Sequence, residues 1–517
     1  MADSEALSLL ENQKRPNRRS DKTYGKKKGL KAPSRAMHFD LFGGDDENNI
    51  TEKMSQLTVE NDRDKTVQPV QQSPAPIEKP SAHHNPRLRG RRKPTSRRMA
   101  ALGQDKLEAL TPLLSLTQRE VRDFQEFGRG LGKKYVCTKL GEGSFADVFE
   151  LRPKESEEAI KLEERGGLVI KVIAFDVEKS DETDDIADME SVIREVRVLL
   201  ALDQMHGFAR CRGVHVVSGK YPDVLLEAFE NFKDTNAIDA QNLSPTNLSE
   251  HQTYVIIEMD HAGSPLSKFG SLSAFQAYDI FWKTAIILSG AEGEFEFEHR
   301  DLHNGNLCFR PRSTNGVMDV TDEIVQNMTE EPLANLGLSN LQVTIIDYTL
   351  SRAKISSESE GELIIFDAIK FWEDNDDTGE HASDQRQFDT YRKVRDWAKA
   401  VEAKVEAMAE IEEDYDLEVV DKYARFLPKS NVMWLSYVAR ELLWRRVDGR
   451  GAIVAGSSKV ARRLQLLLWR KLEAVAAYLV GSPMLIPESA ADLLETAVQL
   501  EWLSWEDVAA FRAELEV

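Results

Sequence analysis

Short apolar runs separated by polar breaks fill the middle of the chain, and they predict β-strands. The runs lie at residues 135–140 and 147–151, on either side of a glycine turn, and at 167–173, 214–217, 224–228 and 254–259. Apolar residues at 189, 192, 193, 196, 199 and 200 instead recur at the helical period, and residues 273–290 predict a second, amphipathic helix. Polar stretches at 234–252 and 311–340 predict loop-like insertions. Helices rich in Leu, Trp and Ala are predicted for the last part of the chain, so strands precede helices, as in an α+β fold.

Residues 1–104 show no sustained apolar period and are rich in Lys, Arg, Pro, Ser, Asn and Gln, which predicts disorder. This tail holds 21 Lys and Arg against 13 Asp and Glu, a net charge of +8. Its basic clusters, Lys26–Lys28 with Lys31 and the run 87–98, are typical of nuclear-import signals or of contacts with DNA phosphates. A merely solvated tail is the alternative.

The charge of the remaining chain has the opposite sign. Because the whole protein carries −21, residues 105–517 carry −29. Such an excess favours solubility, and it also suits a basic substrate. Three cysteines without paired spacing, Cys137, Cys211 and Cys308, argue against a disulfide framework or a zinc site and fit a reducing compartment. Neither a signal peptide nor a membrane-spanning run is apparent, so we expect a soluble intracellular protein with no membrane contact.

The stretch FEHRDLHNGNLCF, residues 297–309, carries the first sign of chemistry. Asp301 is followed five residues later by Asn306, the layout of a phosphoryl-transfer loop in which the carboxylate accepts a hydroxyl proton and the amide oxygen binds a metal. An ordinary polar turn is the alternative. A second signal follows in the expected order, because the apolar strand 343–349 carries Asp347, which can reach another metal position.

Upstream segments predict a nucleotide site. Gly141 and Gly143 allow the backbone to approach phosphates, and Phe145 can cap the turn, although many hairpins contain such glycines. Lys171 lies in an apolar strand, where it needs a charged partner, a phosphate or a path to water. Glu190 or Glu195 on the following helix could pair with it, and the helical pattern does not choose between them.

Six segments together resemble the haspin family of atypical eukaryotic serine/threonine protein kinases, and its fungal-like members. They are GEGSFADVF, LVIKVI, FEHRDLHNGN, TIIDYTLSR, QFDTYR and SNVMWLSY, and they span about residues 133–443. The resemblance implies a bilobal fold with a disordered basic tail at 1–104, a β-rich N-lobe and hinge at 105–262, and a mainly helical C-lobe at 263–517. It also implies ATP and Mg²⁺ as cofactors.

Individual roles follow from the same resemblance. Asp301 corresponds to the catalytic base, Lys171 to the lysine on the α- and β-phosphates, and Glu195 to its helix partner. His303 replaces a lysine that faces the γ-phosphate, and Asn306 and Asp347 correspond to the metal ligands. The implied nucleotide-binding residues, besides these, are Gly141, Glu142, Gly143, Ser144, Phe145, Val148, Met259, Asp260, His261, Ala262 and Gly263. Ala146 replaces a third glycine, and Asn304 stands where haspins usually have Trp.

The family's rebuilt activation segment implies a preformed platform for a histone three tail. The acidic residues expected to bind that basic peptide are Asp374, Asp376, Asp377 and Asp384. A solvated acidic loop is the alternative. Residues 22–26 (KTYGK) resemble motifs that bind a cohesin-associated scaffold protein. We expect a monomer in the nucleus and on chromosomes, with a cytoplasmic pool as an alternative.

Two other functions remain open at this stage. Small-molecule kinases of the aminoglycoside or choline type also carry a catalytic loop with His after Asp-Leu, although DYTLSR and QFDTYR argue against them. A chromatin adaptor with an inactive kinase fold is the other alternative, and the presence of Lys171, Asp301, Asn306 and Asp347 gives it no support.

Overall fold

A computed structural model provides the fold of most of the chain after residue 103. The residues it describes are 104–117, 120–143, 145–155, 167–177, 186–236, 242–312, 316–357, 361–365, 382–409, 424–446, 456–481 and 486–515. The predictions for the basic tail, including its clusters and residues 22–26, lie outside these ranges.

A seven-stranded sheet forms the first half of the described chain. Its strands are β1 (Val121–Asp123), β2 (Tyr135–Glu142), β3 (Ala146–Pro153), β4 (Leu168–Asp176), β5 (Ala187–Asp188), β6 (Cys211–Ser218) and β7 (Thr253–Asp260). The spatial order is β1-β6-β7-β4-β3-β2, with β5 beside β4. The β2–β3, β3–β4, β4–β7 and β6–β7 pairs are antiparallel, whereas β1–β6 and β4–β5 are parallel.

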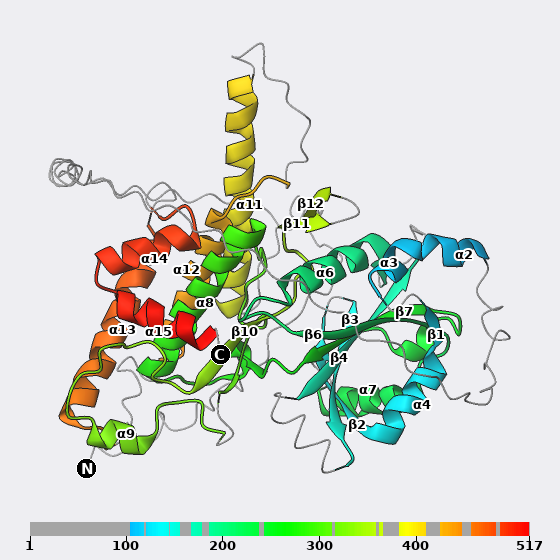
Figure 1. The fold of residues 1–517 in the computed structure, drawn as a ribbon, viewed down its shortest axis with the longest axis horizontal. Helices are drawn as coiled ribbons and strands as arrows, with labels where there is room; N and C mark the ends of the chain where they lie inside the picture. Colours follow the sequence, from blue (N-terminus) through cyan, green and yellow to red (C-terminus); the bar gives the residue numbers. More distant parts are fainter. Residues whose placement is uncertain are drawn as a thin grey trace, which may run out of the picture. The chain divides into compact units, whose positions relative to one another are not determined.

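Helices cover both faces of this sheet (Figure 1). They are α2 (Gln104–Ala109), α3 (Thr111–Ser115) and α6 (Met189–Leu202) near one face, and α4 (Phe124–Lys134) and α7 (Asp223–Thr235) on the other. The alternation of strand side chains explains the two layers, because Val255 and Ile257 join the core with α6 while Tyr254 and Ile256 join the core with α4 and α7.

The prediction of a strand at 224–228 was wrong, since these residues lie in α7. Leu225, Ala228 and Phe229 are its buried residues, at helical spacing, and the helix begins directly after Pro222. A short apolar run is compatible with either a strand or a helix, and the spacing of the apolar residues that flank it is needed to decide between them. The correction matters for the site, because α7 packs behind the strands that carry the glycine turn.

The second half of the described chain is mainly helical. Its helices are α8 (Ala274–Phe295), α9 (Asp322–Asn327), α11 (Ala382–Ala409), α12 (Lys429–Trp444), α13 (Lys459–Leu479), α14 (Ala490–Gln499) and α15 (Trp505–Leu515). The strands β8 (Ser264–Pro265), β9 (Leu307–Pro311) and β10 (Leu341–Ile345) form a small sheet, and β11 (Ala353–Ser357) pairs with β12 (Gly361–Ile365). Two 3₁₀ turns lie at Pro245–Asn247 and Leu266–Lys268. The stretch predicted as a loop at 311–340 therefore contains a short helix, α9.

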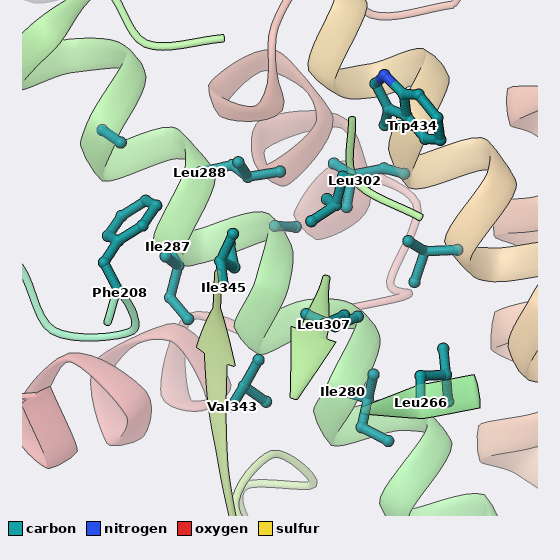
Figure 2. Close-up of a cluster of buried hydrophobic side chains, with 14 of the residues drawn as sticks. Phe208, Leu266, Ile280, Ile287, Leu288, Leu302, Leu307, Val343, Ile345 and Trp434 are labelled. Atoms are coloured by element: carbon teal, nitrogen blue, oxygen red, sulfur yellow. The ribbon is translucent and has the colours of Figure 1, made fainter. Parts of the chain in front are cut away.

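Helix α8 is the buried centre of this half. Ser273 and Gln276 form a capping box at its start, and 16 of its 22 residues are buried. The prediction of an amphipathic helix was therefore wrong, because neighbours pack on nearly all of its sides. Figure 2 shows how Leu302 and Leu307 insert into the same core as Ile280, Ile287 and Leu288. The polar residues between Leu302 and Leu307 are thereby fixed at the edge of the core.

The predicted fold class is confirmed, since a β-rich region precedes a mainly helical one. The domain limits at residues 104 and 262 stay predictions. No helix in the described part of the chain is long and apolar enough to cross a membrane.

Candidate active site

Lys171 lies in the middle of β4 and is the cation of the site. Its Nζ lies 2.6 Å from Glu195 Oε1 and 3.6 Å from Asp347 Oδ1. Glu190, the other residue considered, has an exposed side chain 3.9 Å from Arg194 instead. Burial acts against the charged lysine, but the two carboxylates outweigh it and raise the Lys171 pKa above its usual value. Lys171 therefore stays protonated.

Asp347 follows β10 and turns back toward Lys171. Its backbone has a positive φ of 65°, and Thr349 donates a 2.7 Å hydrogen bond from its hydroxyl to Asp347 Oδ1. Burial alone would raise the Asp347 pKa, but Lys171 and the bonds from Thr349 lower it to about 2. The carboxylate is thus ionised over the whole physiological range, which a cation ligand requires.

Asp301 is held through both of its carboxylate oxygens. Tyr391, from α11, donates its hydroxyl to Oδ1, and Asn306 donates its amide to Oδ2 at 3.2 Å. Asn306 also bonds the Asp301 carbonyl at 2.9 Å, so the loop closes on itself. Burial raises the Asp301 pKa to about 6 despite His303 and these two donors. A carboxylate with such a pKa can accept a proton near neutrality.

Two histidines flank Asp301 and make different contacts. His299 accepts a hydrogen bond from the Asp301 backbone at Nδ1, so its Nε2 carries the proton that contacts the Ile346 carbonyl at 3.1 Å. Burial lowers the pKa of His299 to about 4, which keeps it neutral. His303 Nε2 lies 3.8 Å from Asp301 Oδ1. The structure therefore brings Asp301 and His303, which were both predicted as site residues, into one cluster.

The loop's remaining polar residues face inward. Arg300 has a φ of 61°, and its Nη2 lies 3.1 Å from Glu298 Oε1, which also accepts a hydrogen bond from the Leu427 backbone. Asn304, for which the sequence resemblance would lead one to expect Trp, is buried and donates to Glu441 at 3.3 Å. A polar residue here is thus tied to a buried carboxylate of α12.

The glycine turn connects β2 to β3 next to Lys171. The Gly143 backbone donates to the Ala146 carbonyl at 2.8 Å, and Val148 lies opposite Lys171 in the strand pairing. Phe145 is 40 % exposed. Gly141 has open space around its Cα, whereas Ser144 lies outside the described residues. Glu142 turns its carboxylate to Lys139 at 2.6 Å, inside the protein.

The predicted hinge follows β7 directly. Met259 pairs with Val169 of β4 and with Cys211 of β6, and the Asp260 carboxylate holds Arg212 in a bidentate pair. The His261 backbone donates to the Gly167 carbonyl at 3.1 Å. Among the residues that the structure describes, no backbone hydrogen bond to Ala262 is found.

Gly263 fixes the path of the chain after the hinge. It has a φ of +95°, and a Cβ there would lie 2.0 Å from the Phe309 carbonyl oxygen. Only glycine permits this close approach, which lets β8 pair with β9, the strand that follows residues 301–306.

The donor set fits a hard divalent cation. Asp347 supplies an ionised carboxylate, and Asn306, whose two hydrogen bonds use its amide nitrogen, keeps its carbonyl oxygen as a ligand. Within the described ranges, no group of three His, Cys, Asp or Glu side chains could hold a metal alone. Two protein oxygens suit a divalent cation whose remaining ligands come from a bound molecule or from water.

The acidic peptide site is left open by the structure. Asp374, Asp376 and Asp377 lie outside the described residues, and Asp384 lies in α11 at a position whose side chain is not described. These roles stay predictions. In contrast, Tyr391 and Thr349 were missed as site residues. Both fall within the segments QFDTYR and TIIDYTLSR, but nothing local shows that a tyrosine 90 residues after Asp301 reaches its carboxylate.

Comparisons with known proteins agree with this geometry. A family model described as "Haspin like kinase domain" matches residues 63–470. The serine/threonine-protein kinase haspin homolog hrk1 of Schizosaccharomyces pombe is 30 % identical over 351 residues, which cover 66 % of this chain and 62 % of that protein. The haspin homolog of Drosophila melanogaster is 26 % identical, covering 59 % and 48 %. Mouse haspin is 28 % identical, covering 59 % and 35 %. This chain thus matches less than two thirds of the length of each of these relatives.

Proposed function

The chain belongs to the haspin-like kinase family, and from this premise we propose that it transfers the γ-phosphate of ATP to the threonine near the N-terminus of histone three. The family implies ATP and a divalent metal, and the two oxygen ligands favour Mg²⁺. The observation that carries the proposal is the convergence on one site of Lys171 with Glu195 and Asp347, and of Asp301 with Asn306.

Each residue of the site has one task in this reaction. Lys171, fixed by Glu195, binds the α- and β-phosphate oxygens and orients the nucleotide. Asp347 and Asn306 would hold Mg²⁺, which when bound neutralises charge on the phosphates. The hinge peptides around Ala262 would bind adenine, and the glycine turn would cover the phosphates.

Asp301 positions the attacking hydroxyl and accepts its proton. Its carboxylate oxygens already accept bonds from Tyr391 and Asn306, which fix the plane of the carboxylate before substrate arrives. His303, 3.8 Å from Oδ1, would meet the developing charge of the transferring phosphate from the same side. Such preorganisation lowers the barrier because no group has to reorient during the reaction.

A basic peptide is the substrate that the charge of this chain favours. Residues 105–517 carry −29, and the acidic stretch that contains Asp374, Asp376 and Asp377 directly precedes α11, the helix that supplies Tyr391. A histone tail brings a free amine, Arg and Lys, so complementary charge would raise its association rate and exclude acidic competitors. Because the proposed substrate is a histone, we propose a nuclear, chromosome-associated location. We also propose that the enzyme is a monomer. The basic tail would add contacts with DNA or an import factor, and residues 22–26 contacts with a cohesin-associated scaffold.

A substrate panel tests the proposal. Nucleosomes, a peptide of the histone three N-terminus, an aminoglycoside and choline are incubated with the protein, ATP and Mg²⁺, and phosphate transfer is measured. We expect transfer to the peptide and to nucleosomes, at the third residue of the histone. Transfer to the small molecules alone would support the alternative kinase class, and no transfer would support a non-catalytic adaptor.

The acidic stretch has its own test. Reversing Asp374, Asp376 and Asp377 together to Lys should raise KM for the peptide strongly and KM for ATP little, and added salt should lower kcat/KM of the unchanged protein. Unchanged peptide kinetics in the triple variant would show that this stretch is only a solvated loop.

A further inference from the structure

A second cluster of charges lies behind the glycine turn, away from the catalytic residues. Lys139 of β2 has a fully buried side chain, and its Nζ lies 2.6 Å from Glu142 Oε1 and 2.7 Å from Asp147 Oδ1. The same ammonium lies 3.7 Å from the ring centroid of Phe229, on α7. Two carboxylates at the two ends of the glycine turn thus share one buried cation.

Asn242 completes this cluster from about a hundred residues further along the chain. Its backbone donates to Glu142 Oε2 at 2.8 Å, and its side-chain amide donates to Asp147 Oδ1 and to the Ala146 carbonyl, both at 3.0 Å. The Ala146 carbonyl is the group that closes the turn by accepting from the Gly143 backbone. Asn242 therefore bonds to both strands that border the turn and to the hydrogen-bond acceptor within it.

The physical effect of these bonds is to hold a segment that glycines would otherwise leave mobile. Gly141 and Gly143 give the turn a large conformational freedom, and ordering such a segment costs free energy when a ligand binds. Buried charge networks tolerate little displacement, because a shifted partner leaves another charge unpaired in a medium of low dielectric constant. Burial raises the Asp147 pKa, and the bonds from Lys139 and Asn242 act against that rise. These two donors therefore favour the ionised form of the Asp147 carboxylate.

We propose that Lys139, Glu142, Asp147 and Asn242 form a positioning clamp that holds the glycine turn in the geometry required for the nucleotide phosphates. The clamp removes an ordering cost from nucleotide binding, so the segment around Asn242 and helix α7 set the affinity for ATP. Glu142 then acts through the backbone of the turn rather than on the ligand itself. This inference rests on the proposed kinase function, because it assumes that the turn covers a nucleotide.

The test compares two asparagines that lie five residues apart. Asn242→Ala removes both side-chain bonds of the clamp, whereas Asn247→Ala changes an exposed side chain in the same segment. Binding of a fluorescent ADP analogue with Mg²⁺ gives Kd, and kinase assays give kcat and the KM values for ATP and peptide. We expect Asn242→Ala to raise Kd and KM for ATP about fivefold to tenfold, with kcat at saturating ATP and KM for peptide within about twofold of the unchanged protein. Asn247→Ala should match the unchanged protein throughout.

Hydrogen exchange of the free protein supplies an independent readout. Backbone amides at residues 141–147 should exchange faster in Asn242→Ala, and those of β7 should not. A lower unfolding free energy with unchanged Kd and unchanged local exchange would overturn the clamp and leave Asn242 a merely structural residue. If the protein without substitutions binds no nucleotide, the proposed function and the clamp are overturned together. If that protein and Asn242→Ala bind nucleotide with the same Kd, the clamp alone is overturned.

Discussion

Asp347 illustrates how much a single residue has to satisfy in this site. It adopts a left-handed backbone conformation, accepts from Thr349 and lies 3.6 Å from the Lys171 ammonium. Few side chains tolerate such a φ, and Asp and Asn are among them because their short polar groups bond to the nearby backbone. Asp at this position therefore satisfies the backbone and supplies the ionised carboxylate that the proposed metal site needs.

Asp347→Asn should separate these two requirements. We expect kcat to fall roughly 100-fold or more, because a neutral amide binds a divalent cation poorly. The protein should still fold, but its unfolding free energy near pH 7 should fall by roughly 2 kcal/mol, because the amide loses the stabilisation that lowers the Asp347 pKa. Steady-state kinetics and urea unfolding measure the two effects. Asp347→Ala is the control, since it should lose activity equally and should be about 1 kcal/mol less stable than Asp347→Asn because of the positive φ at this position. Near-normal turnover of Asp347→Asn would remove this residue from the catalytic site.

Glu292 gives a prediction for the dependence of stability on pH. It is buried in α8, where burial raises its pKa from 4.5 to about 7 although Asn431 and the backbone of Ala490 donate to it. A raised carboxyl pKa means that the folded state binds the proton more tightly than the unfolded state. The contribution of Glu292 to the unfolding free energy should thus fall as pH rises from about 4.5 to 7.

Glu292→Gln should abolish that part of the pH dependence. Between pH 5 and pH 7.5 the unfolding free energy of the unchanged protein should fall by roughly 1 to 3 kcal/mol more than that of the variant. Urea unfolding at each pH measures the two values. Parallel curves for the two proteins would show that Glu292 is ionised in the folded state throughout.

At the scale of single residues, sequence patterns identified those with a fixed spacing to a motif and missed those that arrive from elsewhere. Asp301 and Asn306 could be named from their spacing, Lys171 from its place in an apolar strand and Asp347 from its place at the end of one. The structure brings them into two adjacent clusters. Tyr391 and Asn242 could not, because the first contacts Asp301 from a distant helix and the second contacts the glycine turn from an insertion. The helical pattern alone did not choose between Glu190 and Glu195, whereas the family resemblance favoured Glu195, which the structure places against Lys171.

At the scale of elements, the mispredictions share one physical cause. The run 224–228 became part of α7, and α8 is buried on nearly every side rather than amphipathic. In both cases the tertiary surroundings decide which sides of an element are covered, and local hydrophobic spacing does not contain that information. The strands β4 and β7 were predicted well because their apolar runs suit a sheet that is covered on both faces.

Helix α15 connects distant elements through one carboxylate. Asp507 is fully buried and accepts hydrogen bonds from the backbones of Asn335, Leu336 and Ser504, and from the Tyr278 hydroxyl of α8. It therefore fixes the stretch after α9 against the central helix.

Asp507→Ala should lower the unfolding free energy by roughly 3 kcal/mol, because several buried donors lose their acceptor at once. Asp492→Ala, on the exposed face of α14, is the matched control and should change it by less than about 0.5 kcal/mol. Thermal or urea unfolding compares them. Equal effects of the two substitutions would contradict the role assigned to Asp507.

At the scale of the whole molecule, charge and core are divided along the chain. The tail carries +8 and the rest −29, whereas Leu110 and Leu113, shortly after the tail, are fully buried in the main core. The segment around α3 is thus part of the folded unit.

Deleting residues 1–100 should leave kcat/KM for a free peptide within about twofold, and it should weaken nucleosome binding and reduce the salt dependence of that binding. Deleting residues 1–116 should in addition lower the unfolding free energy by several kcal/mol, since it removes Leu110 and Leu113. Binding measured at two salt concentrations and unfolding curves test both statements. A protein without residues 1–100 that fails to phosphorylate peptide would place the tail within the catalytic unit.

The anchoring of α15 also has a consequence for folding of the chain during translation. The strands of the first sheet and the helices that cover it all precede residue 261, so this half can fold while the chain is still growing. The core around α8 contains Val508 and Phe511, and therefore it closes only after the ribosome has translated those codons. Until then the apolar surface of this core that Val508 and Phe511 cover is exposed to solvent. Nascent chains stalled between these two stages should accordingly be the species that chaperones bind and proteases remove.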